Sequence, residues 1–275
     1  MTFSKVKQER LADVIARQLE GLVLDGVLQP GERLPPEREL AREMDVSRPS
    51  LREALQKLEA AGLVETRHGG GTYVRNAFAD ALGDPLADLF QRHPEAALDF
   101  VEFRHTLDGI VAYYAALRGT DEDREMLTAR FRAIEAVHGE DDPTEEAERD
   151  AEFHIAIAEA SHNVVLLHVM RSLLDLLRKD VLFNRTLLYS RKDARDVLMT
   201  QHRTIYDRIM NGDAEGARAA AQAHMQHVEK VLRDFRSSEA RSDVARRRLS
   251  HFLASRDGSG AAASGASAPP DSPGS

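Results

Sequence analysis

Apolar side chains recur at helical spacing near the start of this 275-residue chain and again along most of its second half. In residues 8–26 they are three or four positions apart, so a helix presents them on one face. The residues concerned are Leu11, Ile15, Leu19, Leu22 and Val23. Gly26 lies just beyond them, as is common where a helix ends. We therefore expect a first amphipathic helix that packs on a core.

Two shorter helical patterns come next, separated by a break. Pro35 and Pro36 open the first, over 36–44, since proline is tolerated in the first turn of a helix. Ser47 is a suitable cap for the second helix, because its hydroxyl can accept a hydrogen bond from a free N–H of the first turn. The second helix carries an apolar stripe formed by Leu51, Ala54, Leu55 and Leu58. The pattern predicts two helices joined by a tight turn.

Residues 62–74 predict a small hairpin. Gly62-Leu63-Val64 starts a strand, His68-Gly69-Gly70-Gly71 forms a turn, and Thr72-Tyr73-Val74 returns as a second strand. Over 34–74 the order is therefore helix, turn, helix and hairpin. This order is typical of a winged helix-turn-helix, a module that binds DNA.

The second of these helices carries polar residues opposite its apolar stripe. Arg48, Ser50 and Arg52 lie near its N-terminal end, where a recognition helix meets bases and phosphates. An arginine can donate two hydrogen bonds to guanine, and a hydroxyl can bind phosphate or base. Each residue alone is equally consistent with a solvated helix face. Their combination with the surrounding order favours DNA contact.

Period-3.6 apolar stripes recur from residue 98 onward, and no strand pattern follows the hairpin. They predict helices over 98–118, 121–139, 144–161, 163–183, 193–211 and 213–236. Residues 77–97 contain Gly83, Pro85 and Pro94, which indicates a connector that is helical only in part.

The expected fold class is mainly α, with an N-terminal winged helix-turn-helix and a C-terminal all-α antiparallel helical bundle. We assign residues 1–76 to the first domain, 77–97 to a linker and 98–236 to the bundle. Residues 237–275 are expected to be a polar, largely disordered tail, because their last part is rich in Gly, Ala, Ser and Pro.

Composition narrows the possible functions. The chain has no cysteine, which excludes disulfides, thiolate metal sites and thiol catalysis. It has no apolar run of membrane-spanning length and no signal-peptide pattern at its start, so we expect a cytoplasmic protein. The net charge is −9, yet Lys and Arg balance Asp and Glu in residues 1–76. DNA affinity would therefore depend on local arginine contacts rather than on long-range attraction.

A second candidate site lies among the histidines of the predicted bundle. Asp150 and His154 are four residues apart and share one helix face. His202 and His224 flank a predicted turn, so on an antiparallel helix pair they lie at about the same level. One carboxylate and three imidazoles suit a divalent ion such as Zn²⁺, Ni²⁺ or Mn²⁺. The alternative is a set of histidines that each make an ordinary hydrogen bond.

The N-terminal motifs resemble those of a known family. PGERLPPERELA, VSRPSLREAL and GLVETRHGGGTYV are similar, nearly throughout, to the winged helix of the GntR family of bacterial transcription regulators. The resemblance implies DNA contacts by Arg38, Arg48, Ser50, Arg52, His68 and Gly69. It also implies a homodimer that binds an inverted-repeat operator in double-stranded DNA.

The second half resembles the FCD effector domain of the FadR-type branch of that family. The matching segments are EFRHTLD, RDAEFHIAIAEASHN, QHRTIYDRIMNGDAEGAR and QAHMQHV. The resemblance implies a divalent metal on Asp150, His154, His202 and His224, with the carboxylate of a small effector beside it. It assigns Arg104 to that carboxylate, for which a guanidinium is well shaped. The alternative for Arg104 is a salt bridge with a neighbouring acid.

Two effectors follow from resemblance within the branch. RHTLDGIVAYYAALRGTDED and LLYSR most resemble the pyruvate-responsive repressors, whereas the Asp150–His154 pair resembles the L-lactate-responsive regulators. The expected function is a repressor of central carbon metabolism that a small carboxylate releases from DNA, with pyruvate as the main candidate and L-lactate or another 2-hydroxy acid as the alternative. A metal-dependent hydrolase with a DNA-binding head is a remote alternative, since no general base is evident. We therefore expect no enzymatic activity.

Overall fold

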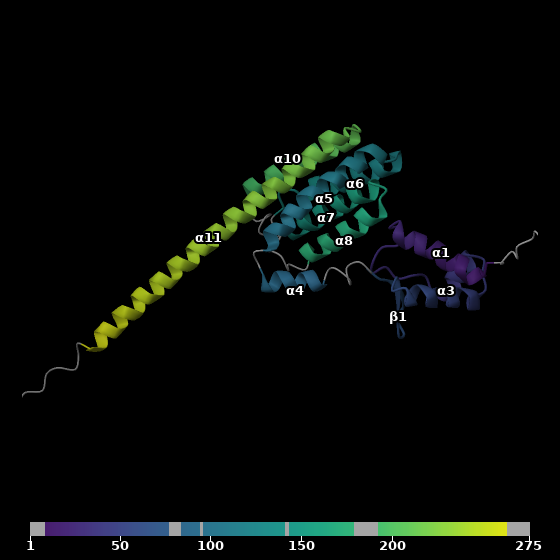
Figure 1. Ribbon diagram of the computed structural model, residues 1–275, viewed down its shortest axis with the longest axis horizontal. Helices are drawn as coiled ribbons and strands as arrows, with labels where there is room; N and C mark the ends of the chain where they lie inside the picture. Colours follow the sequence, from purple (N-terminus) through teal and green to yellow (C-terminus); the bar gives the residue numbers. More distant parts are fainter. Residues whose placement is uncertain (1–8, 77–83, 94–95, 141–142, 179–191, 263–275) are drawn as a thin grey trace, which may run out of the picture. The chain divides into compact units, whose positions relative to one another are not determined.

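The computed structural model describes residues 9–76, 84–93, 96–140, 143–178 and 192–262 (Figure 1). The chain divides into two compact units, residues 1–228 and 229–275. The first unit holds the predicted DNA-binding module and most of the helical bundle. The second consists of the far part of the last helix and the residues that follow it.

The N-terminal module is a winged helix-turn-helix, as the sequence predicts. Its elements are α1 (Leu11–Leu24), α2 (Glu37–Glu43), α3 (Arg48–Ala60), β1 (Val64–Arg67) and β2 (Gly71–Val74). The two strands pair antiparallel, with Val64 opposite Val74 and Arg67 opposite Gly71. The apolar stripes of the three helices and the hairpin form one core. The most deeply buried residues of this core include Ile15, Leu51, Ala54, Leu58 and Val64.

Local chemistry explains where α3 begins. Ser47 has extended backbone, and its side chain accepts a hydrogen bond from the backbone N–H of Ser50 at 3.3 Å. Pro49 lies in the first turn, where its missing N–H leaves no partner unsatisfied. The N-terminal end of α3, with its polar face, is therefore held at a defined place in the module.

The wing depends on a glycine at the start of β2. Gly71 has φ +101°, a conformation that L-residues with a side chain rarely adopt. A Cβ at this position would also lie 2.8 Å from the Arg33 Nε. Arg33 pairs with Tyr73 through an isolated β-bridge, so the segment before α2 closes against the hairpin.

The bundle contains α5 (Ala96–Arg118), α6 (Asp121–Val137), α7 (Pro143–Ala160), α8 (Val164–Arg178), α10 (Lys192–Met210) and the first part of α11 (Ala214–Ala262). Figure 1 shows α5, α6, α7 and α8 running side by side. Helix α7 packs against α5, α6 and α8, and α10 packs against α5 and α6. Small buried residues let neighbouring helices approach α7 closely: Ala151, Ala156, Ala158 and Ala160. The mainly α fold class is thus confirmed.

Two regions differ in detail from the expectation. Within 77–97, residues Asp84–Arg92 form the helix α4, while 77–83 and 94–95 lie outside the described residues. Helix α11 continues to Ala262, whereas we expected helix to end near 236 and a disordered tail to follow. The sequence holds neither glycine nor proline between Gly216 and Gly258, so nothing in it interrupts the backbone hydrogen bonds. The rest of the predicted tail, 263–275, lies outside the described residues.

No helix within the described ranges has the length and hydropathy that crossing a lipid bilayer requires.

Replacing Ser47 by alanine tests the cap of α3. The N–H of Ser50 then loses its acceptor, and we expect the free energy of unfolding to fall by about 1 kcal/mol. Thermal or urea unfolding followed by circular dichroism measures the change. Ser47→Thr is the matched control, because it keeps an oxygen in the capping position. Equal losses in both variants would contradict a capping role.

Candidate metal centre and nucleic-acid interface

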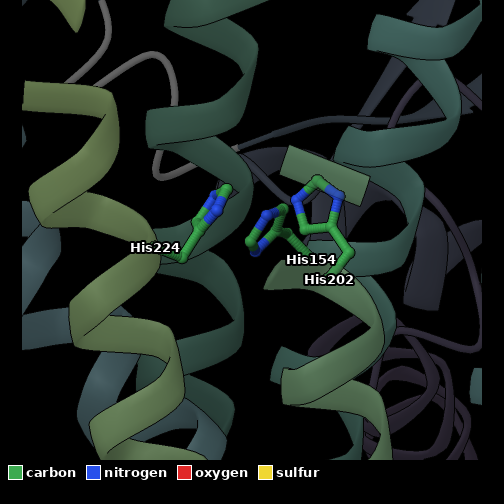
Figure 2. Close-up of side chains that lie close together, drawn as sticks. All are labelled: His154, His202 and His224. Atoms are coloured by element: carbon green, nitrogen blue, oxygen red, sulfur yellow. The ribbon is translucent and has the colours of Figure 1, made fainter. Parts of the chain in front are cut away.

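Three histidines from three helices meet in the core of the bundle. His154 comes from α7, His202 from α10 and His224 from α11. Each offers one ring nitrogen, and these three atoms lie within 4.8 Å of one another. Figure 2 shows the rings gathered between the helices. All three residues are buried, so the cluster is screened from bulk water.

Asp150 lies beside this cluster. It precedes His154 by one turn of α7 and is also buried. Its Oδ1 is 2.8 Å from the Nε2 of His202 and 3.4 Å from the Nε2 of His154. The structure therefore brings together all four residues that the sequence singled out, with one carboxylate oxygen next to two imidazoles.

Burial keeps two of the imidazoles neutral. It lowers the pKa of His154 to about 4. The Asp108 charge opposes this with a smaller upward effect, and the Arg104 charge adds a smaller downward one. Burial also lowers the pKa of His224 well below its usual value, and the nearby His202 and His154 add to this. A neutral imidazole keeps one nitrogen lone pair for a metal ion.

A contact outside the cluster orients one ring. The Nδ1 of His224 lies 3.1 Å from the Oε1 of Gln201, which can accept a hydrogen bond from it. When Nδ1 donates, Nε2 carries the lone pair. Three buried imidazoles beside the Asp150 carboxylate form a donor set that suits Zn²⁺, Ni²⁺ or Mn²⁺. These four residues therefore fit a divalent metal ion.

A small cavity adjoins the cluster. Its lining residues are Asp108, Val111, Ala112, His154, Ile157, Met170, Ile205 and Ala221. Arg104 lies one turn before Asp108 on α5 and is buried, with its guanidinium paired to the Asp108 carboxylate. Arg104 was expected from the sequence, whereas Asp108 was not. Asp108 lies four residues after Arg104 on the same helix face, and this spacing is the signal that could have indicated it.

The residues expected to contact DNA lie on the surface of the winged helix. Arg38, Arg48, Arg52, His68 and Gly69 are exposed, and Ser50 is half-buried beside the hydroxyl of Ser47. They come from α2, from the N-terminal end of α3 and from the turn between the strands. Exposure is what a contact surface requires.

Glu37 holds two of these arginines and was missed in the sequence. The Nη2 of Arg52 donates to its Oε2 at 2.8 Å, and the Nη2 of Arg48 lies 3.7 Å from the same atom. The hydrogen bond from Arg52, with smaller contributions from the charges of both arginines, lowers the pKa of Glu37. An ionised Glu37 thus links the start of α2 to the polar face of α3.

The buried histidines make the stability of the metal-free protein depend on pH. The unfolded chain binds protons at these histidines near pH 6.5, whereas folded His154 binds one only near pH 4. The unfolded state therefore gains protons first as the pH falls, and the free energy of unfolding decreases between these values. Between pH 7 and pH 5 we expect a loss on the order of 2 kcal/mol for His154. Urea unfolding of chelator-treated protein at pH 7, 6 and 5 measures it, and a stability that does not decrease would contradict neutral, buried imidazoles.

Comparison with known proteins agrees with both halves of the structure. Residues 11–74 match the model for "Bacterial regulatory proteins, gntR family", and residues 99–227 match the FCD domain. The "Putative L-lactate dehydrogenase operon regulatory protein" of Escherichia coli K12 is 37% identical to this chain, and the match covers 86% of the chain and 92% of the relative. The "Glc operon transcriptional activator" of the same strain is 34% identical, and that match covers 83% of the chain and 92% of the relative.

A third relative comes from another bacterium. The "HTH-type transcriptional regulator LutR" of Bacillus subtilis is 33% identical to this chain, over 77% of the chain and 96% of the relative. These matches cover the winged helix and the bundle together. The chain therefore belongs to the gntR family of bacterial regulatory proteins, carries an FCD domain, and is a DNA-binding transcription regulator rather than an enzyme.

Proposed function

We propose that this regulator controls an operon of carbon metabolism and that its FCD domain senses a small 2-hydroxy acid, such as L-lactate. The observation that carries the proposal is the buried His154, His202 and His224 cluster with a small cavity and the Arg104–Asp108 pair beside it. The relative named for an L-lactate dehydrogenase operon supports the choice of acid. This relative favours the alternative effector of the sequence analysis over pyruvate, its main candidate.

His154, His202 and His224, with Asp150, would hold the divalent ion. A bound ion would attract a carboxylate and a neighbouring hydroxyl oxygen as a Lewis acid. Arg104 would pair with the effector carboxylate, because a guanidinium matches that group in shape and charge. The cavity is small and its wall is mostly apolar, with Val111, Ala112 and Met170 among its residues, so it would favour a ligand with a short carbon chain.

At the other end of the chain, the winged helix would bind the operator. We assign the DNA contacts to Arg38, Arg48, Ser50, Arg52, His68 and Gly69. Glu37 would keep Arg48 and Arg52 extended over one surface until bases or phosphates compete for them. A homodimer would present two such surfaces to the two halves of an inverted repeat.

The effector would act by favouring one arrangement of the dimer over another. A ligand shifts such an equilibrium only as far as it binds the two states unequally. Typical coupling of about 1–3 kcal/mol changes DNA affinity roughly 5- to 150-fold. We propose that the acid-bound state has the weaker affinity for DNA, so that the protein represses until the acid accumulates.

Fluorescence anisotropy of the full chain on the inverted repeat from its own upstream region tests the sensing function. L-Lactate is expected to weaken DNA binding by about 5-fold or more, in line with ordinary allosteric coupling. Pyruvate, titrated separately, is expected to act only at higher concentration. Release by pyruvate alone would restore the pyruvate alternative. An affinity that neither acid changes would contradict the sensing function.

Replacing His202 by alanine tests the metal centre. The variant loses one imidazole of the cluster, and we expect its metal affinity to fall by more than about 100-fold, beyond the usual effect of changing a residue that only orients a ligand. Metal content after dialysis measures the loss, and anisotropy measures the effector response. His251→Ala is the matched control, because His251 is exposed on the far part of α11. A variant that melts lower yet responds normally to the acid would show that the metal is purely structural.

A further inference from the structure

Arg104 and Asp108 form a buried ion pair on α5. The Nη2 of Arg104 donates to the Oδ2 of Asp108 at 2.5 Å, and its Nε lies 3.4 Å from the Oδ1. The exposed fractions of the two side chains are 8% and 3%. A carboxylate so deeply buried needs compensation for its charge, and this guanidinium provides it.

Asp108 also lines the small cavity beside the histidine cluster. Among the described residues that line the cavity, only Asp108 and His154 carry polar side chains. The other lining residues are Val111, Ala112, Ile157, Met170, Ile205 and Ala221. Asp108 is therefore the one acidic side chain beside His154 in the described part of this wall.

The charge of Asp108 restricts what can bind there. An ionised carboxylate only accepts hydrogen bonds. An acid that pairs with Arg104 brings a second negative charge close to Asp108, which is unfavourable unless the ligand also offers a donor. The guanidinium has five N–H donors, of which Asp108 engages two, so Arg104 can pair with Asp108 and with a ligand carboxylate at once.

We infer that Asp108 sets the preference of the site for 2-hydroxy acids over 2-oxo acids by accepting a hydrogen bond from the ligand's 2-hydroxyl. This inference rests on the proposed function. The 2-hydroxyl is a donor next to the carboxylate, so it can reach Asp108 while the carboxylate faces Arg104. The ketone oxygen of a 2-oxo acid has only lone pairs, and it would face the lone pairs of Asp108 without a proton between them.

The size of the effect follows from leaving a buried acceptor unpaired. Such a loss corresponds to a factor of roughly 10 to 100 in affinity. The competing role for Asp108 is that of a counter-ion which only holds Arg104 in place. A pure counter-ion would affect every carboxylic acid alike, because all of them present the same group to Arg104.

The test compares matched acids on the full, metal-loaded chain by isothermal titration calorimetry. The pairs are L-lactate with pyruvate and L-2-hydroxybutyrate with 2-oxobutyrate, whose members carry a hydroxyl or a ketone at carbon 2. For the wild type we expect the hydroxy acid to bind about 10- to 100-fold more tightly in each pair. In Asp108→Asn the amide can donate to a ketone, so this ratio is expected to fall at least about 10-fold.

Two further variants sharpen the comparison. Glu102→Gln makes the same change of charge at an exposed position of α5 and is expected to leave the ratio unchanged. Asp108→Ser puts a hydroxyl, which can donate as well as accept, in place of the carboxylate, and it should reduce the ratio as Asp108→Asn does. Metal content and melting temperature are measured on each variant, so that only folded, loaded protein enters the comparison.

The outcomes separate this inference from the proposed function. Wild-type protein that binds both members of each pair equally would overturn the role of Asp108, even if no Asp108 variant folds. Variants that weaken both acids by the same factor would also overturn it and leave Asp108 as a counter-ion. If the wild type binds none of the four acids, the proposed function fails, and the role of Asp108 fails with it.

Discussion

The FCD bundle is organised around polar groups that must be satisfied in an apolar interior. Three imidazoles and the Asp150 carboxylate lie together among the side chains of α7, α10 and α11. Burial disfavours charge on such groups, as the lowered pKa values of His154 and His224 show. The helices must therefore keep a register in which these side chains meet one another, because a buried polar group without a partner destabilises the fold.

The same constraint extends to α5 through Arg104 and Asp108. This pair is buried close enough to the histidines for both charges to affect the pKa of His154. Arg104, Asp108 and the histidine cluster thus form one polar region inside the bundle, with a small cavity at its edge. A ligand that enters this region replaces or adds to these interactions, so its binding can alter how α5 and α7 pack.

The winged helix also contains a cluster of charged side chains, but this cluster is exposed. Glu37 on α2 holds Arg48 and Arg52 of α3, but these side chains are mostly open to solvent. Water screens this cluster, so it contributes little to stability. It keeps two guanidinium groups on one surface, where the proposed DNA contact would let phosphates compete for them. One cluster is thus buried and specifies a packing, and the other is exposed and remains available for a partner, in line with the proposed division into a sensing half and a DNA-binding half.

The sequence by itself determined the mainly α fold and the order of its elements, because helical spacing and capping residues such as Ser47 act over short distances. For Asp150, His154, His202 and His224 it offered a metal site as one of two alternatives, and only folding shows that these residues lie together. It could not determine that α11 continues to Ala262, since a polar helix and a disordered tail share much of their composition. Nor could it single out Asp108 or Glu37, whose importance comes from the partners that folding brings to them. Only the tertiary structure decided which charges are buried together, because burial and distance, rather than residue type, set the strength of an ion pair.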